Sequence, residues 1–175
     1  QAAGIYFSVY QVGSFIRSFY TVRGEFEKQK VSLGAILQST EQAGVLYERI
    51  KDLAVKSPFQ FSELISYTKQ LSAFSVPYNE LFDTTKRLAD ISAGLGVDMN
   101  RLVLAFGQVR SASVLRGQEL RQFTEAGIPL VDELAKKFTK LTGEATSAGD
   151  VFDKISRSQV SFQKVKDIFT ELTSE

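Results

Sequence analysis

The chain has 175 residues, with 21 basic and 20 acidic side chains and neither histidine nor cysteine. This length is enough for one domain with a hydrophobic core, or for a smaller domain with an extension. Balanced, interspersed charge weighs against a nucleic-acid surface, which needs clustered lysine and arginine. The lack of histidine and cysteine excludes the usual zinc sites, disulfides, thiol chemistry and imidazole catalysis, so we expect no metal and no cofactor.

The N-terminal stretch, residues 1–16, carries no charge. Polar residues interrupt it, and it is shorter than the roughly 20 apolar residues that a membrane span requires, so we predict no span here. Because the chain begins at Gln1, we expect it to be a piece of a longer protein.

Apolar residues recur in steps of four and three from Ile5 onward, which is the a/d pattern of a coiled-coil seam. The pattern predicts one long helix, a rod segment over residues 1–38. Two seam positions are basic, so the pattern is imperfect. The seam consists of Ile5, Val9, Val12, Ile16, Phe19, Arg23, Phe26, Lys30, Leu33 and Leu37.

Five aromatic residues widen the apolar face of this predicted helix beyond the seam, namely Tyr6, Phe7, Tyr10, Phe15 and Tyr20. A helix with so wide an apolar face has to bury it. The rest of the domain is one candidate to cover the face. A second copy of the chain is the other, because a small domain touches only part of a long helix and leaves aromatic surface exposed. The sequence leaves both open, and the second predicts a homo-oligomer through the N-terminal helix.

Residues 39–175 predict a compact domain of about seven shorter helices, because start and stop signals follow one another closely. Capping residues and Pro77 open helices, whereas Pro58 and a glycine-rich stretch each end one. In chain order these signals are the capping box Ser39–Gln42, Pro58, Pro77, Gly94-Leu95-Gly96 and Asp98.

The stretch from Leu115 to Phe138 is the best-specified element and predicts two helices around a corner. Gly117 loosens the entry, and Gly127 stands where a helix ends in a left-handed residue. Ile128 must be extended because Pro129 follows it, and Pro129 serves as the first residue of the next helix. That helix places an apolar stripe on one side. The stripe comprises Leu130, Val131, Leu134, Phe138 and Leu141.

The C-terminal part predicts two more helices. The capping pattern Ser147–Asp150 starts a short helix whose apolar face is Val151, Phe152 and Ile155, and Ser161 caps the last helix. No segment alternates with period two. We therefore predict an all-α protein without a sheet.

Catalytic chemistry would have to come from carboxylates. Each candidate falls on the polar side or in the first turn of a predicted helix, where acidic residues have a structural reason to be. We therefore interpret all of them as structural. The candidates are Glu63, Glu80, Glu119, Glu125, Asp132 and Glu133.

Four segments, taken in order, resemble the conserved domain of phage and prophage tail tape measure proteins. The resemblance covers roughly Arg23 to the C-terminus, and the ordered set is more specific than any one piece. The segments are Arg23-Gly24-Glu25, Ser57-Pro58-Phe59, Leu88–Gly96 and Gly117–Pro129.

The resemblance implies a structural protein of the virion tail, assembled in the bacterial host cytoplasm, with tail tube and tail tip or baseplate proteins as partners. Tape measure proteins set tail length as tube subunits polymerise around them. A helix gains only about 1.5 Å per residue, so this chain is too short to be a whole one and resembles its compact domain with part of the rod. The family has no catalytic motif in this region. Two alternatives remain, a muralytic hydrolase with a glutamate as acid and a cellular coiled-coil adaptor.

Overall fold

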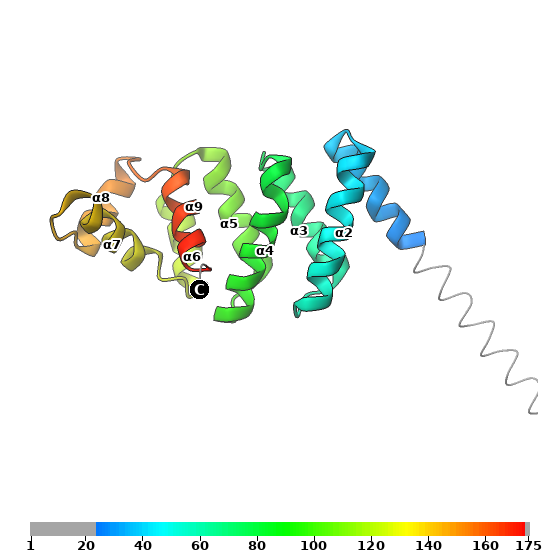
Figure 1. Ribbon diagram of the computed structural model, residues 1–175. Coiled ribbons are helices and arrows are strands. Elements are labelled where there is room, and N and C mark those ends of the chain that lie inside the picture. Colours follow the sequence, from blue (N-terminus) through cyan, green and yellow to red (C-terminus); the bar gives the residue numbers. More distant parts are fainter. Residues whose placement is uncertain (1–23, 174–175) are drawn as a thin grey trace, which may run out of the picture. The chain divides into compact units, whose positions relative to one another are not determined.

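The structure is a computed structural model that describes residues 24–173 (Figure 1). Every regular element in this range is an α-helix, in agreement with the predicted all-α class. The β-pairing among the same residues is one isolated antiparallel bridge between Val114 and Ser161. The chain divides into two compact units between Glu48 and Arg49. The predicted domain boundary at residues 38 and 39 stays a prediction.

The first unit contains a helix over residues 24–37 and the start of α2 (Thr40–Lys56). Ser39 caps α2, because its Oγ accepts a hydrogen bond from the Gln42 N–H at 3.2 Å. Of the predicted long helix over residues 1–38, the structure describes only residues 24–37 as helix. Residues 1–23, with most of the predicted seam, lie outside the described residues.

The second unit contains the end of α2 and the helices that follow it. Residues 39–173 hold eight helices in all, where the sequence predicts about seven. The helices after α2 are α3 (Phe61–Ala73), α4 (Tyr78–Leu95), α5 (Met99–Ala112), α6 (Gly117–Glu125), α7 (Leu130–Thr142), α8 (Ala148–Ser156) and α9 (Phe162–Glu171).

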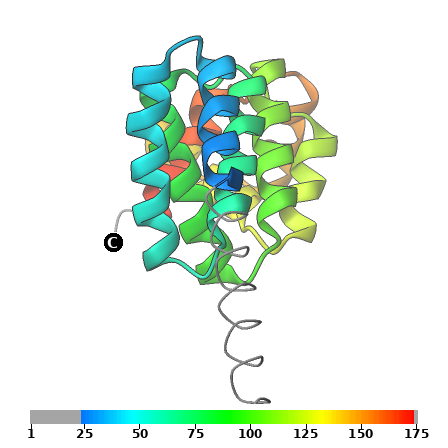
Figure 2. The same cartoon turned by 90° about the vertical axis from the view of Figure 1, so that its right-hand side faces the viewer.

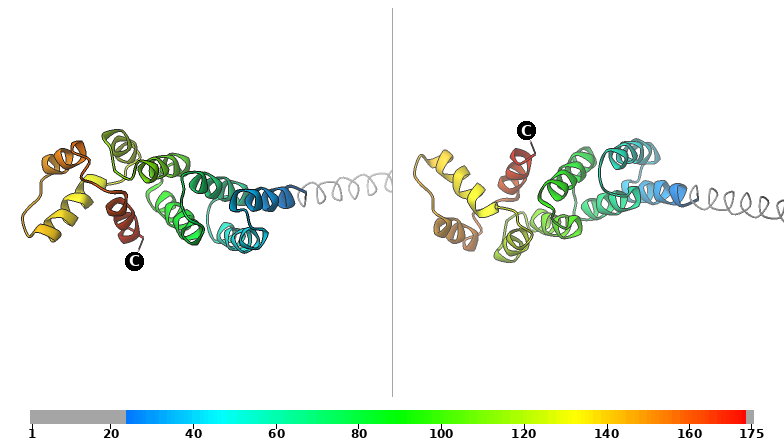
Figure 3. Two further views of the ribbon diagram at one scale, coloured as in Figure 1. Left: turned by 90° about the horizontal axis from the view of Figure 1, so that it is seen from above. Right: turned by 90° about the horizontal axis from the view of Figure 1, so that it is seen from below.

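Neighbours in the sequence are mostly neighbours in space within the second unit. Helix α3 packs against α4 and α5, and α5 packs against α6. Figure 2 shows α4 and α5 lying side by side. Helices α7 and α8 form a hairpin through the loop 143–147, which is clear in both views of Figure 3. The exception is α9, which returns to contact α4, α5 and α7.

Four aromatic rings hold α9 in this place. Phe106 of α5 lies 5.2 Å from Phe162 and 5.5 Å from Phe169, measured between ring centroids. Phe123 of α6 lies 5.3 Å from Phe169 in an edge-to-face arrangement. Such pairs contribute about 0.5–1.5 kcal/mol beyond the burial of their area. The cluster therefore links α5, α6 and α9, which are separated by up to about sixty residues in the sequence.

Backbone pairing next to the aromatic cluster fixes where α9 starts. The Leu115 N–H donates to the Val160 carbonyl at 2.8 Å, and the Phe162 N–H donates to the Ser113 carbonyl at 2.9 Å. These bonds join the loop before α6 to the loop before α9. They satisfy backbone groups that would otherwise be buried without partners, since Leu115 and Val160 are fully buried.

The corner between α6 and α7 is a Schellman motif. The Ile128 N–H donates to the Phe123 carbonyl at 3.0 Å, and the Gly127 N–H donates to the Thr124 carbonyl at 2.9 Å. Gly127 has φ +85°, the left-handed conformation that the sequence predicts. Ile128 and Phe123 are both buried, as the apolar contact of this motif requires.

Two expectations for α7 are wrong. Pro129 is the residue before the helix, with φ −77° and ψ 48°, and α7 begins at Leu130 and not at the proline. The expected buried stripe also ends early, because Leu141 is 66% exposed. Leu141 has the right spacing, but it lies in the last turn of α7, where no described helix covers it.

The expected apolar face of α8 needs a similar correction. Val151 and Ile155 are buried, whereas Phe152 is 53% exposed. Residue 152 is turned by about 100° from residue 151 around the helix, so a narrow contact with α7 buries one and leaves the other at the surface.

Candidate interaction surfaces

The predicted corner residues serve the packing of α6 on α7. Gly117 is the first residue of α6 and is exposed. Ile128 is buried between the two helices, next to Gly127 and Pro129 in the turn. Gly127, Ile128 and Pro129 are consecutive in the turn between α6 and α7, whereas Gly117 lies at the opposite end of α6, so only the last three form the corner.

The aromatic residues predicted to mediate interaction lie outside the described residues. They are Tyr6, Phe7, Tyr10, Phe15 and Tyr20. The described part of the same predicted helix adds two exposed apolar side chains, Val31 at 70% and Ile36 at 43% exposure. Leu33, a seam position, is 1% exposed, so the described end of the seam faces inward.

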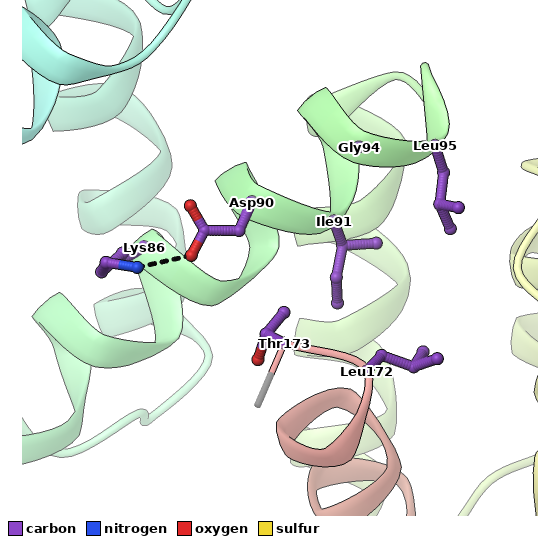
Figure 4. Close-up of a pocket in the computed structure, with 7 residues that line it drawn as sticks. All are labelled: Lys86, Asp90, Ile91, Gly94, Leu95, Leu172 and Thr173. Carbon is purple, nitrogen blue, oxygen red and sulfur yellow. Dashed lines mark hydrogen bonds and ion pairs between the residues drawn. The ribbon is translucent and has the colours of Figure 1, made fainter. Parts of the chain in front are cut away.

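A groove of about 430 Å³ lies between α4 and the end of α9 (Figure 4). Its apolar lining comes from Ile91, Leu95 and Leu172, and Leu95 is half exposed. The Lys86 Nζ and the Asp90 carboxylate lie at one end, paired at 2.6 Å. Because these charges neutralise each other, the groove suits an apolar side chain better than an ionic ligand. No local sequence pattern marks this groove, since α9 meets α4 only in the folded chain.

Polar contacts hold the end of α9 in the position that forms this groove. The Arg87 Nε donates to the Thr173 Oγ1 at 3.2 Å, and the Lys166 ammonium pairs with Glu80 of α4 at 2.7 Å. On the other side, Lys137 of α7 donates to Glu171 at 2.7 Å. That hydrogen bond is the main reason why the pKa of Lys137 is raised above its usual value.

A second groove, of about 450 Å³, lies within the first unit. A Cβ on Gly34 would be in ordinary van der Waals contact with atoms of Thr40 and Ala43 at 3.9–4.0 Å. The groove is lined by Glu27, Lys30, Val31, Gly34, Ala35 and Thr40.

The six candidate carboxylates are not brought together. Glu63 accepts from the Gln60 N–H at 2.9 Å at the start of α3, and Asp132 is exposed in the first turn of α7. The others form ion pairs with single basic residues: Glu80 with Lys166, Glu125 with Arg101 and Glu133 with Lys136. Within residues 24–173, no three His, Cys, Asp or Glu side chains are placed to hold a metal ion.

Glu119 differs from the other five because it is 7% exposed, and its Oε2 has no hydrogen-bond partner. Glu119 lies in the first turn of α6, as predicted. It also precedes the buried Phe123 by four residues, which places both side chains on the buried face of the helix. That spacing is the signal that sequence reasoning missed. Glu119 lines neither of the two grooves described above.

Of the helices in residues 24–173, none has the length and apolar character to cross a membrane. Residues 17–175 of the chain match a protein family described as tape measure protein. No curated protein and no solved structure matches the chain. The family match begins six residues before the resemblance noted in the sequence and covers most of the chain. Tape measure proteins are structural components of virion tails, and this chain belongs to the tape measure protein family.

Proposed function

We propose that this chain is the compact domain of a phage or prophage tail tape measure protein, together with part of the adjoining helical rod. In this role it contributes to tail assembly and to tail-length determination as a structural component without catalysis. Family membership over residues 17–175 supports the assignment.

The rod self-associates through its N-terminal segment. The observation that carries this proposal is the apolar width of residues 5–20, where five aromatic residues flank the seam. The described helix 24–37 carries two further exposed apolar side chains, Val31 and Ile36. Burying such surface against a second copy releases about 25 cal/mol for each Å² removed from water.

The compact domain docks helix faces onto tail tube and tail tip or baseplate proteins. Two sets of exposed apolar side chains in the second unit support this role. One is at the groove between α4 and α9 and consists of Leu95, and the other consists of Leu141 in the last turn of α7 and Phe152 of α8. Large apolar side chains at a rim of charged residues are typical of protein contacts.

Native mass spectrometry and sedimentation test the self-association. The seam variant Val9→Asp with Ile16→Asp places two charges on the predicted apolar face, seven residues apart. The matched control, Gln11→Asp with Ser18→Asp, adds the same charges at the same spacing on the polar face. We expect oligomers for the parent chain and the control, and monomers for the seam variant. A monomeric parent chain would overturn this part of the proposal.

Tail assembly in the phage that encodes the chain tests docking. Leu95→Glu and Leu141→Glu each place a charge on a proposed docking surface. Val55→Glu is the control, because Val55 is an apolar side chain on α2 that is 82% exposed and belongs to neither surface. We expect at least a tenfold loss of assembled tails, counted by electron microscopy, for one or both of the first two. Normal tail numbers for both would exclude these two surfaces from docking.

A further inference from the structure

We propose that Lys154 of α8 and Lys164 of α9, together with Phe138 of α7, bind an acidic segment of a partner protein. We call these three residues the two-lysine site. The proposal rests on the proposed docking of the compact domain and names the chemistry of the partner at one place on that domain. The partner presents a carboxylate of aspartate or glutamate with an apolar side chain beside it.

Three helices bring two ammonium groups to one aromatic ring. The Lys154 Nζ lies 5.2 Å from the centroid of the Phe138 ring, and the Lys164 Nζ lies 5.9 Å from the same centroid. Phe138 is 7% exposed, and both lysines are half-buried. A lysine in such a place buries its methylene stem and keeps its ammonium group in water. Two positive charges are therefore held at the surface beside one ring, where a single acidic segment can reach both.

Neither ammonium group of the site forms an ion pair or a hydrogen bond with another residue in the range 24–173. The acidic residues one helical turn from the two lysines already have partners. Asp150 accepts hydrogen bonds from the N–H and the hydroxyl of Ser147. Asp167 pairs with Lys137 at 3.7 Å. The two charges of the site are therefore available to a carboxylate from outside.

The other basic residues of the segment 130–173 are either exposed or paired. Lys140 is exposed to solvent, and the remaining four each pair with a carboxylate. The two lysines of the site are the cations of this segment that are partly desolvated and yet lack such a partner. The four pairs are Lys136 with Glu133, Lys137 with Glu171, Arg157 with Asp153 and Lys166 with Glu80.

Helix stability does not explain the position of Lys164. It is the third residue of α9, whose first turn contains no acidic residue. The N-terminal end of a helix carries partial positive charge, so an ammonium group there is unfavourable. Lys154, in contrast, lies in the last turn of α8, where a cation is favourable. A role in binding accounts for Lys164, because a carboxylate from a partner would neutralise its charge.

An exposed apolar side chain adjoins the site and indicates a protein as the partner. Leu141 follows Phe138 by three residues on α7, which makes them neighbours along the helix, and it is 66% exposed. A partner that covers Leu141 and also neutralises the lysines needs an apolar side chain next to a carboxylate. Carboxylates form short, charge-assisted hydrogen bonds with ammonium groups. Nucleic acid fits less well, because its backbone needs many clustered basic residues and the charges of this chain are balanced.

Tail assembly in the phage that encodes the chain tests the role of the two charges. Lys154→Met with Lys164→Met removes both charges and keeps long side chains beside the Phe138 ring. We expect at least a tenfold loss of assembled tails, counted by electron microscopy, and parent-like numbers for Lys154→Arg with Lys164→Arg. The control, Lys56→Met with Arg121→Met, removes two exposed charges of α2 and α6 and should assemble normally. Parent-like tail numbers for the two-methionine variant would overturn the proposal.

Urea unfolding of the purified full chain separates binding from folding. Lys164→Met alone removes an unfavourable charge from the first turn of α9, so we expect a chain at least as stable as the parent. The same variant should assemble fewer tails. A Lys164→Met chain that loses both tails and stability would show that the lysine acts in folding, and would overturn the proposal.

Second-site suppressors identify the partner. Phage that carries Lys154→Glu with Lys164→Glu is passaged until tail assembly recovers, and its genome is sequenced. We expect changes from aspartate or glutamate to lysine or arginine in another tail protein. Recovery only through changes in this chain would overturn the proposal. Binding of the parent chain, but not of the two-methionine variant, to double-stranded DNA in a gel mobility assay would assign the lysines to nucleic acid and would also overturn it.

The two-lysine site and the proposed docking role fail in different ways. If Leu141→Glu reduces tail numbers but the two-methionine variant does not, the compact domain docks through this surface without an acidic partner, and only the two-lysine site is wrong. If Leu95→Glu, Leu141→Glu and the two-methionine variant all give normal tail numbers, both are wrong.

Discussion

The ring of Phe74 fills the space where a side chain of residue 107 would begin. A Cβ built on Gly107 would lie 2.0 Å from the Phe74 Cδ2 and 2.4 Å from its Cγ. Phe74 ends α3 and Gly107 is buried in the middle of α5, so the two helices approach as closely as they do because residue 107 has no side chain. Glycine in a helix interior costs about 1 kcal/mol relative to alanine, and here the close packing offsets that cost.

Gly107→Ala should therefore destabilise the chain, although alanine is the better helix former. Overpacking of this kind costs about 1–3 kcal/mol in the free energy of unfolding, measured by urea denaturation. Gly94→Ala is the matched control, because Gly94 is also helical and a Cβ there would meet nothing within 4 Å. The control should be neutral or stabilising by up to about 1 kcal/mol. Adding Phe74→Leu to Gly107→Ala should restore part of the loss, and a Gly107→Ala variant as stable as the Gly94→Ala control would contradict this explanation.

Thr68 of α3 and Thr85 of α4 meet hydroxyl to hydroxyl at 3.0 Å, and both are fully buried. Each hydroxyl also lies within hydrogen-bond distance of the carbonyl four residues earlier, at 2.7 Å from Leu64 and 2.8 Å from Leu81. If one threonine hydroxyl is removed, the other can still donate its proton to the carbonyl four residues earlier. Neither hydroxyl is therefore left without a hydrogen-bond partner. We expect Thr68→Val and Thr85→Val each to cost about 1 kcal/mol or less.

The double variant Thr68→Val with Thr85→Val should cost less than the sum of the two single variants, because two apolar groups of the same shape then pack together. Thermal or urea unfolding of all four proteins measures this coupling. Strictly additive losses would show that the two hydroxyls act independently.

Gly127 and Ser158 both adopt left-handed backbone conformations after a helix, with φ +85° and +56°. An L-residue in this region costs about 1–2 kcal/mol, and glycine does not carry that cost. Gly127→Ala should therefore destabilise the chain by about 1–2 kcal/mol. The new Cβ would clash with no atom, so the cost comes from the left-handed backbone conformation alone. Ser158→Gly should instead raise the stability by up to about 1 kcal/mol, less the entropy that glycine adds to the unfolded chain. Urea unfolding measures both changes in the free energy of unfolding, and changes of the same sign for the two substitutions would rule out this explanation.

Asp150 gives α8 a stability that depends on pH. Hydrogen bonds from the hydroxyl and the backbone N–H of Ser147, at 2.6 and 2.8 Å, hold the pKa of Asp150 below its usual value. A lowered pKa in the folded state means that the contribution is present above the unfolded pKa of about 3.9 and is lost as the pH falls through the folded value. Asp150→Asn should lower the melting temperature at pH 7, and the difference from the parent chain should shrink below about pH 4. Asp52→Asn on the exposed side of α2 is the control, and a difference for Asp150→Asn that does not change with pH would contradict the assignment.

Helix ends were the features that the sequence determined by itself. Ser39, Asp98 and Ser147 each cap the helix that their spacing predicts, and Gly127 has the predicted left-handed conformation. These signals act within one helical turn, so they need no knowledge of distant residues. The same locality explains why Pro129 was misplaced by only one position.

The tertiary structure alone decided which surfaces meet. Helical periodicity marks a face as apolar but does not say how far a neighbour covers it, so Leu141 and Phe152 were expected inside and are exposed, whereas Glu119 is buried. The groove between α4 and α9 and the contact of Gly107 with Phe74 join residues that are tens of positions apart. Such contacts depend on how the helices pack as a set, because each close approach is fixed by the volumes of side chains on both partners.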